Sequence, residues 1–293
     1  GAVLAIALVT GVLIAVRRTA WNRVDPLPIV RRRRVGQILR ASVETFRGRA
    51  MTYMLIGLAA LPFAALAGLV AAGLKVLPGV GDLIELSAEG GGLATSLIVS
   101  GMTSLVAFVA IIALVAWIMG QSEQGRAATL TDAVRALSQR AGGIAAALAR
   151  AVVIVTVLLL SIVGVPWGLR QLFRYQFIAQ AAMLEGQDGA AALARSSQLV
   201  RGRWWHTAFV VALLNMVVVV VAGAVGLVAL IALRPPFWSL SVVIVIVEVL
   251  AFPLAAIALT LLFGDAVAEH AAAADVADEQ LAVSAATGPG QLS

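Results

Sequence analysis

The sequence predicts an all-α membrane protein, a polytopic transmembrane helix bundle of about seven spans. Of the 293 residues, 61% are hydrophobic and 12% are charged, which is roughly half the charge of a soluble domain. The apolar residues form runs long enough to cross the ~30 Å hydrocarbon core of a bilayer as helices. A water-soluble globule is therefore excluded. Because the chain has no cysteine, a disulfide framework, a thiolate nucleophile and a cysteine-bound metal are excluded as well.

Six apolar runs are the most evident spans. They lie at residues 2–16, 51–74, 93–119, 144–165, 205–233 and 237–263. The first run would extend about 24 Å as a helix, which is short for a crossing, so we expect this helix to begin upstream of Gly1. A seventh stretch, residues 167–184, has a helical pattern but carries Arg170, Gln171 and Arg174, so hydropathy alone would miss it.

The charges of the loops orient these spans. Residues 17–50 hold ten arginines and are predicted to face the cytosol, whereas loop 75–92 is acidic and is predicted to lie outside. Arginines return in loop 120–143 and again at 195–203, so a crossing at 167–184 is needed to bring the second group back. The C-terminus is then cytosolic, in a multi-pass protein of the bacterial cytoplasmic membrane. The six tryptophans lie at or near the predicted ends of the crossings, as interfacial aromatic residues do.

The chain divides into three predicted parts. Residues 1–26 are expected to hold a truncated N-terminal transmembrane helix and a basic linker. Residues 27–265 form a six-span membrane domain. Residues 266–293 are rich in alanine, aspartate and glycine and are expected to be a disordered acidic tail.

Three interfacial amphipathic helices are predicted at the cytosolic surface, each before a transmembrane hairpin. They lie at residues 36–48, 130–141 and 190–201. Aligning the Arg-Gly-Arg at 47–49 with that at 201–203 places Ser42 on Ser196, which indicates a loose threefold helix-plus-hairpin repeat. Basic loops are required beside cytosolic ends of spans in any case, so a chance likeness is the alternative.

A motif follows the stretch 167–184. It consists of Glu185-Gly186, Ala192-Leu193-Ala194-Arg195-Ser196 and Arg201-Gly202. In these residues, and over about 27–265, the chain resembles the glycerophosphoryl diester phosphodiesterase membrane-domain family, which places a Glu-Gly turn and an Ala-Leu-x-Arg-Ser helix after a span. The resemblance implies a helical membrane domain. It implies no phosphodiesterase activity, because that activity belongs to a fused barrel that this sequence does not contain.

Four polar residues fall within the predicted spans. Glu248 is about 17 Å and Asn215 about 15 Å into their crossings, and Arg174 is about 10 Å deep with Arg170 one turn away. A carboxylate at this depth needs a partner, so we predict that Glu248 pairs with Arg174. One interpretation of the cluster is a structural ion pair. Another is a functional site, either a proton or ion relay or a site for a lipid headgroup. A third possibility is that Glu248 is neutral. One acid, one base and one amide favour the structural interpretation.

The remaining arginines suggest contact with anionic lipid headgroups, although their role as orientation signals would suffice. The candidates are Arg31, Arg32, Arg33, Arg34, Arg201 and Arg203. No nucleotide-binding, metalloprotease or hydrolase motif occurs, and we expect no catalytic residue, metal, cofactor or nucleic-acid partner. The sequence thus predicts a non-enzymatic accessory or scaffold that contacts anionic lipid, a partner protein or a fused soluble module. The alternative is a small transporter or lipid-handling protein that uses the intramembrane polar cluster.

Overall fold

The computed structural model describes residues 21–59, 61–62, 65, 69, 91–233 and 237–286. Every regular element among these residues is a helix and none is a strand, so the all-α class is confirmed for this part of the chain. The helices are α2 (Val35–Gly48), α3 (Ala50–Leu58), α6 (Gly91–Glu123), α7 (Leu130–Leu160), the 3-10 turn η1 (Ile162–Gly164), α8 (Val165–Arg174), α9 (Ile178–Leu184), α10 (Ala190–Val200), α11 (Trp204–Leu233) and α12 (Phe237–Ala286).

Three of the described helices are long and apolar enough to cross a membrane. These stretches are Gly101–Glu123 in α6, Leu130–Leu160 in α7 and Val247–Gln280 in α12. The predicted span at 2–16 and most of the acidic loop 75–92 lie outside the described residues. A count of seven spans therefore stays a prediction.

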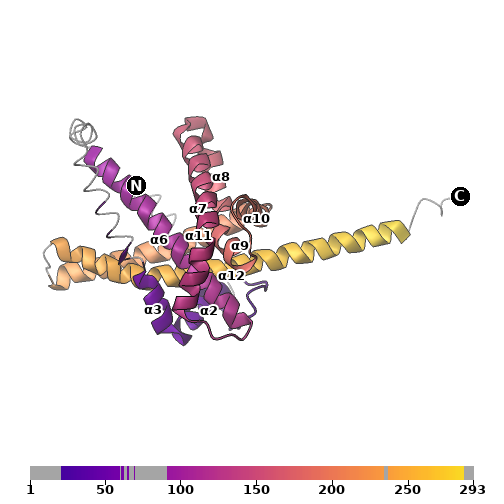
Figure 1. Cartoon of the computed structure of the whole chain (residues 1–293), viewed down its shortest axis with the longest axis horizontal. Helices are drawn as coiled ribbons and strands as arrows, with labels where there is room; N and C mark the ends of the chain where they lie inside the picture. The colour runs from indigo at the N-terminus through magenta and orange to yellow at the C-terminus, as the bar shows by residue number, and fades with distance from the viewer. Residues whose placement is uncertain are drawn as a thin grey trace.

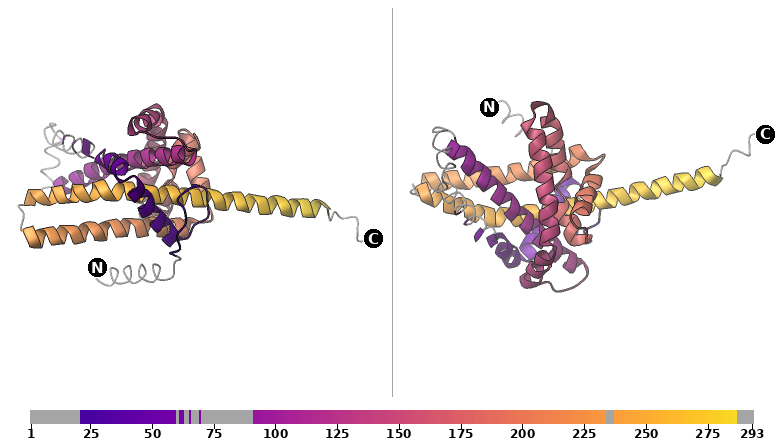
Figure 2. Two further views of the ribbon diagram at one scale, coloured as in Figure 1. Left: turned by 90° about the horizontal axis from the view of Figure 1, so that it is seen from below. Right: turned by 45° about the horizontal axis from the view of Figure 1, so that its top comes forward.

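Helix α12 is the centre of the arrangement. It runs beside α11 as an antiparallel pair, while α6 and the α7–α8 hairpin cross over this pair (Figure 1; Figure 2, left). Helices α2, α3 and α6 also pack against α12. The contact between α3 and α12 is very close, since a Cβ atom on Gly57 would lie 2.0 Å from the carbonyl oxygen of Val249. Small residues at such crossings allow helices to approach closely enough for extensive van der Waals contact.

The segment 167–184 does return along α7, but as two short helices rather than one continuous crossing. Helix α8 ends at Arg174 and α9 begins at Ile178. The return is fastened by Arg140 of α7, which donates hydrogen bonds to the carbonyl oxygens of Ala182 at 2.5 Å and Met183 at 3.1 Å. The end of α9 therefore lies beside the first half of α7.

Only two of the three predicted amphipathic segments are separate helices. These are α2 and α10, whereas 130–141 is simply the beginning of α7, because no proline follows it and Gly142-Gly143 does not end the helix. Ser42 and Ser196, expected at the interface, are buried against the protein. The faces of α2 and α10 that carry these serines therefore pack against the other helices.

The expectation of a disordered tail is wrong for most of its length. Helix α12 continues without a break to Ala286 and projects beyond the other helices (Figure 1). The stretch 266–286 contains no glycine or proline and many alanines, which have the highest helix propensity. Because the apolar half of α12 already supplies the nucleus, each added residue only has to extend the helix.

Candidate functional site

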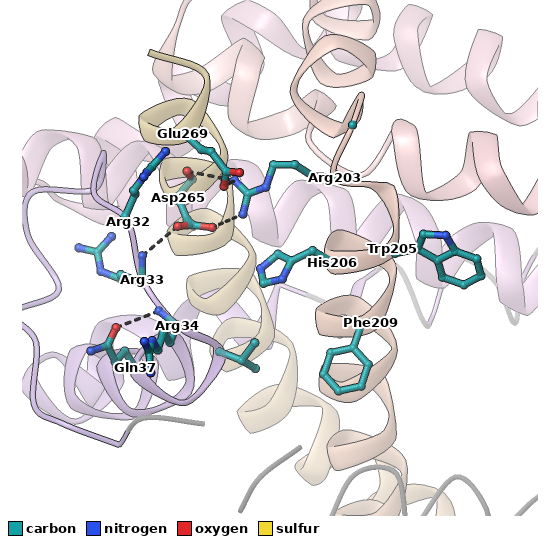
Figure 3. Close-up of a pocket in the computed structure, with 12 residues that line it drawn as sticks. Arg32, Arg33, Arg34, Gln37, Arg203, Trp205, His206, Phe209, Asp265 and Glu269 are labelled. Atoms are coloured by element: carbon teal, nitrogen blue, oxygen red, sulfur yellow. Dashed lines mark hydrogen bonds and ion pairs between the residues drawn. The ribbon is translucent and has the colours of Figure 1, made fainter. Parts of the chain in front are cut away.

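A buried carboxylate joins three distant parts of the chain. Asp265 of α12 is 3% exposed and accepts a hydrogen bond of 2.8 Å from the backbone N–H of Arg33. Its other oxygen lies 2.6 Å from Nη2 of Arg203, just before α11, and Nη1 of Arg203 lies 2.8 Å from Glu269. We call Arg33, Arg203, Asp265 and Glu269 the Asp265 junction (Figure 3). It fastens the N-terminal loop and the start of α11 to α12.

The side chain of Arg33 organises the loop that precedes α2. Its guanidinium donates to the carbonyl oxygens of Ile29 at 2.8 Å and Pro28 at 2.6 Å. Burial lowers the pKa of Arg33 and the nearby Arg31 adds to this effect, while Asp265 opposes it. The loop carbonyls therefore replace the water that the buried cation has lost.

A glycine permits the loop to approach α12. A Cβ atom on Gly264 would lie 2.0 Å from the carbonyl oxygen of Ile29, so no larger residue fits without a shift of the backbone. The N–H of Ile29 in turn donates to Glu123 at the end of α6, at 3.0 Å. The segment Gly264-Asp265 thus provides both the space and the charge that the loop needs.

An open pocket of about 1110 Å³ lies beside this junction. It is formed by the loop and the start of α2, the first two turns of α11, and α12 (Figure 3). Its lining includes Arg32, Arg34, Trp205, His206 and Phe209 together with the four residues of the Asp265 junction. We call it the basic pocket, because four arginines outnumber two carboxylates on its walls.

The cations of the basic pocket have unequal roles. Arg33 and Arg203 are engaged in the Asp265 junction, whereas neither Arg32 nor Arg34 forms an ion pair with a carboxylate among the described residues. The buried Nε2 atom of His206 has no hydrogen-bond partner in the described part of the chain, and its ring extends from α11 toward Asp265 in Figure 3. The pocket therefore offers two exposed guanidinium groups, while Nε2 of His206 is closed off from it.

The six arginines predicted to contact lipid are thus divided. Four are exposed, namely Arg31, Arg32, Arg34 and Arg201. For Arg33 and Arg203 the expectation needs correction, because both side chains are used inside the protein. The guanidinium of Arg33 is held by carbonyl oxygens of its own loop, and that of Arg203 by Asp265 and Glu269 of α12.

The predicted intramembrane polar cluster is not assembled. Arg174 donates through Nη2 to the hydroxyl of Ser197 on α10, not to Glu248, because it lies at the α8–α9 break, which packs against α10. Asn215 donates to the carbonyl oxygen of Val211 in its own helix, at 2.9 Å, and Arg170 is exposed. Glu248 has no ion pair or hydrogen bond with any other described residue.

The motif residues form a second polar joint. Glu185 and Arg195 make a bidentate ion pair with distances of 2.7 and 2.8 Å, and this hydrogen bonding raises the pKa of Arg195 while burial opposes it. The hydroxyl of Ser196 accepts from the N–H of Phe177 at 3.0 Å and donates to the carbonyl oxygen of Arg174 at 2.7 Å. These are backbone groups at the break between α8 and α9, so Ser196 stabilises the break.

The residue that sequence reasoning missed is Asp265. A signal was present, since Asp265 is the first acid after the long apolar run of the last span and follows a glycine directly. Its partners could not be read from the sequence, because they lie 62 and 232 residues away.

Comparison with known proteins assigns no family. No family model matches the chain, and no curated protein or solved structure matches it either. The family resemblance therefore rests on the motif residues alone.

Proposed function

We propose that this chain is a multi-pass protein of the bacterial cytoplasmic membrane, a non-enzymatic accessory or scaffold that contacts anionic lipid headgroups at its cytosolic face. The basic pocket beside the Asp265 junction carries this proposal. It unites the arginine run, the start of α11 and the end of the apolar part of α12, which are segments that loop charges assign to the cytosolic side. Exposed arginines at such a level attract anionic headgroups.

The outer faces of the helices support a membrane location. Large apolar side chains on α7 and the segment that follows it point outward, with Leu160 81% and Val163 79% exposed. In water such a surface would be a liability, whereas hydrocarbon chains solvate it without cost. The three helices long enough to cross a membrane fit the same environment.

The scaffold role is favoured over transport by where the buried charges lie. Transport would use a polar site near the middle of the membrane, and the residues proposed for one, Glu248, Arg174 and Asn215, have separate surroundings. The buried ionic groups instead fasten helices together at one end of the bundle. A partner protein or fused module would contact the same face.

Reporter fusions test the orientation. A reporter that is active only in the cytosol should be active when fused after Gly189 or after Ala286. A reporter that is active only outside the membrane should be active when fused after Gly90. An extracytoplasmic reporter at Gly189 would contradict the crossing of 167–184 and move the basic pocket away from the cytosol.

Thermal unfolding tests the lipid contact. The purified protein in mild detergent should gain more stability from added phosphatidylglycerol than from phosphatidylcholine, and the difference should shrink as salt is raised, because exposed charges are screened. Equal stabilisation by the two lipids would contradict the proposal.

A further inference from the structure

We propose that the basic pocket is a specific site for the phosphate of one anionic phospholipid headgroup, bound by Arg32 and Arg34. This inference rests on the proposed function, which requires only a diffuse attraction between the exposed arginines and the membrane. A defined site makes a stronger claim, since it assigns the attraction to particular atoms in one cavity.

The backbone of the arginine run presents two guanidinium groups to the pocket. Arg34 is extended, with φ −82° and ψ 157°, and successive side chains in extended chain point to opposite sides. Arg33 is turned inward, and its N–H is held by Asp265 at 2.8 Å. Arg32 and Arg34 therefore flank the junction on the pocket side (Figure 3). Guanidinium groups bind phosphate through paired N–H donors and stay charged at any physiological pH.

The carboxylates of the pocket leave these two charges available. Asp265 is committed to Arg203 and to the N–H of Arg33, and Glu269 to Arg203 at 2.8 Å. Neither carboxylate pairs with Arg32 or Arg34 among the described residues. An incoming phosphate thus meets a net positive wall although acids are present.

His206 lines the pocket, but its unpartnered nitrogen is not open to it. Its Nε2 atom is withdrawn from solvent and has no hydrogen-bond partner in the described part of the chain, and a buried polar atom without a partner costs about 1–3 kcal/mol in proteins. Because Nε2 is closed off from the pocket, the phosphate is bound by the two exposed arginines.

The aromatic residues of the pocket favour a lipid over a free phosphate compound. Trp205 is 79% and Phe209 42% exposed, and both line the pocket at the start of the apolar helix α11. Exposed tryptophan at the end of an apolar helix is typical of the headgroup level. A phosphate held by Arg32 and Arg34 would then have its acyl chains alongside the apolar surface that begins at Phe209.

Native mass spectrometry of the full chain in detergent tests the site, with dioleoylphosphatidylglycerol as the probe and dioleoylphosphatidylcholine for comparison. The pocket variant combines Arg32→Gln and Arg34→Gln. Its matched control combines Arg126→Gln and Arg135→Gln, which remove the same charge from exposed arginines outside the pocket. We expect phosphatidylglycerol affinity to fall about 25-fold in the pocket variant, from about fivefold per arginine near the surface, and about fivefold or less in the control.

The outcomes separate the two proposals. Equal losses in both variants would overturn the specific site and leave the diffuse contact standing. A wild-type protein that does not prefer phosphatidylglycerol would overturn both. Displacement of the bound lipid by inorganic phosphate at low millimolar concentration would overturn the lipid assignment, because it would show a site for a soluble phosphate compound. Unchanged unfolding temperatures of both variants without lipid would establish that each has folded.

Discussion

Neighbouring arginines in one run behave in opposite ways. Arg33 is 5% exposed and anchors a loop through backbone carbonyls and Asp265, whereas Arg32 and Arg34 are exposed on either side of it. The same contrast separates Arg203, which pairs with two acids, from Arg201, which is exposed. One basic run therefore contains both residues that stabilise the fold and residues that stay exposed.

Whether an arginine is buried or exposed depends on whether carboxylates or carbonyl oxygens lie within reach of its guanidinium group. A buried guanidinium is stable only where carboxylates or carbonyls replace its water. Asp265 and the carbonyls of the N-terminal loop provide such a place for Arg203 and Arg33. Arginines beyond the reach of these groups remain in solvent, where their charge can act on a membrane or a ligand.

The largest loss of stability is expected when the buried arginines lose their carboxylate. Asp265→Asn removes the charge opposite Arg203, and we expect the free energy of unfolding to fall by about 3 kcal/mol, at the lower end of the range for a broken buried pair because Glu269 remains. Thermal unfolding in detergent measures the loss. The control is Asp275→Asn on the exposed part of α12, with a change within about 0.5 kcal/mol. Equal losses would contradict a structural role for Asp265.

A second variant tests the close approach that makes the junction possible. Gly264→Ala places a Cβ atom 2.0 Å from the carbonyl oxygen of Ile29, and we expect a loss of about 2–3 kcal/mol from the forced backbone shift. Gly142→Ala in α7 meets no atom within 4 Å and should gain up to about 1 kcal/mol from helix propensity. Proteolysis of the N-terminal loop should accelerate in the Gly264 variant alone. An intact loop would argue against this packing.

A third variant addresses the other polar joint. Ser196→Ala deprives the N–H of Phe177 and the carbonyl of Arg174 of their partner, and we expect a loss of about 2 kcal/mol because buried backbone groups are left unpaired. Ser138→Ala, at an exposed site on α7, is the control. A loss no larger than that of the control would mean that water satisfies the break between α8 and α9.

The smallest expected effect concerns Arg174 and Glu248. Because Arg174 is bonded to Ser197, the stability changes of Glu248→Gln and Arg174→Gln should add within about 0.5 kcal/mol in a double-mutant cycle. Thermal unfolding of both single variants and the double variant gives the coupling. Strong non-additivity would support the ion pair that the calculated depths of the two residues in the membrane predicted. It would also favour the transport interpretation.

Sequence reasoning succeeded where the signal is local. Apolar runs predicted α6, α11, the second part of α7 and the first part of α12, and amphipathic spacing predicted α2 and α10, because burial patterns repeat with the helical period. It failed at the tail, where a polar but alanine-rich stretch extends α12. It also failed at the Glu248–Arg174 pair. The depth of Arg174 in the membrane was calculated for one continuous helix over 167–184, whereas the helix is broken after Arg174.

Hydrophobicity and helix propensity act over one turn or one helix, so the order of amino acids alone accounts for the all-α class and for the positions of most described helices. Which arginines become buried depends on how distant segments pack against one another. Arg33 and Arg203 meet Asp265 only when α11, α12 and the N-terminal loop have packed. The free energy of a charge depends on the groups that surround it in space.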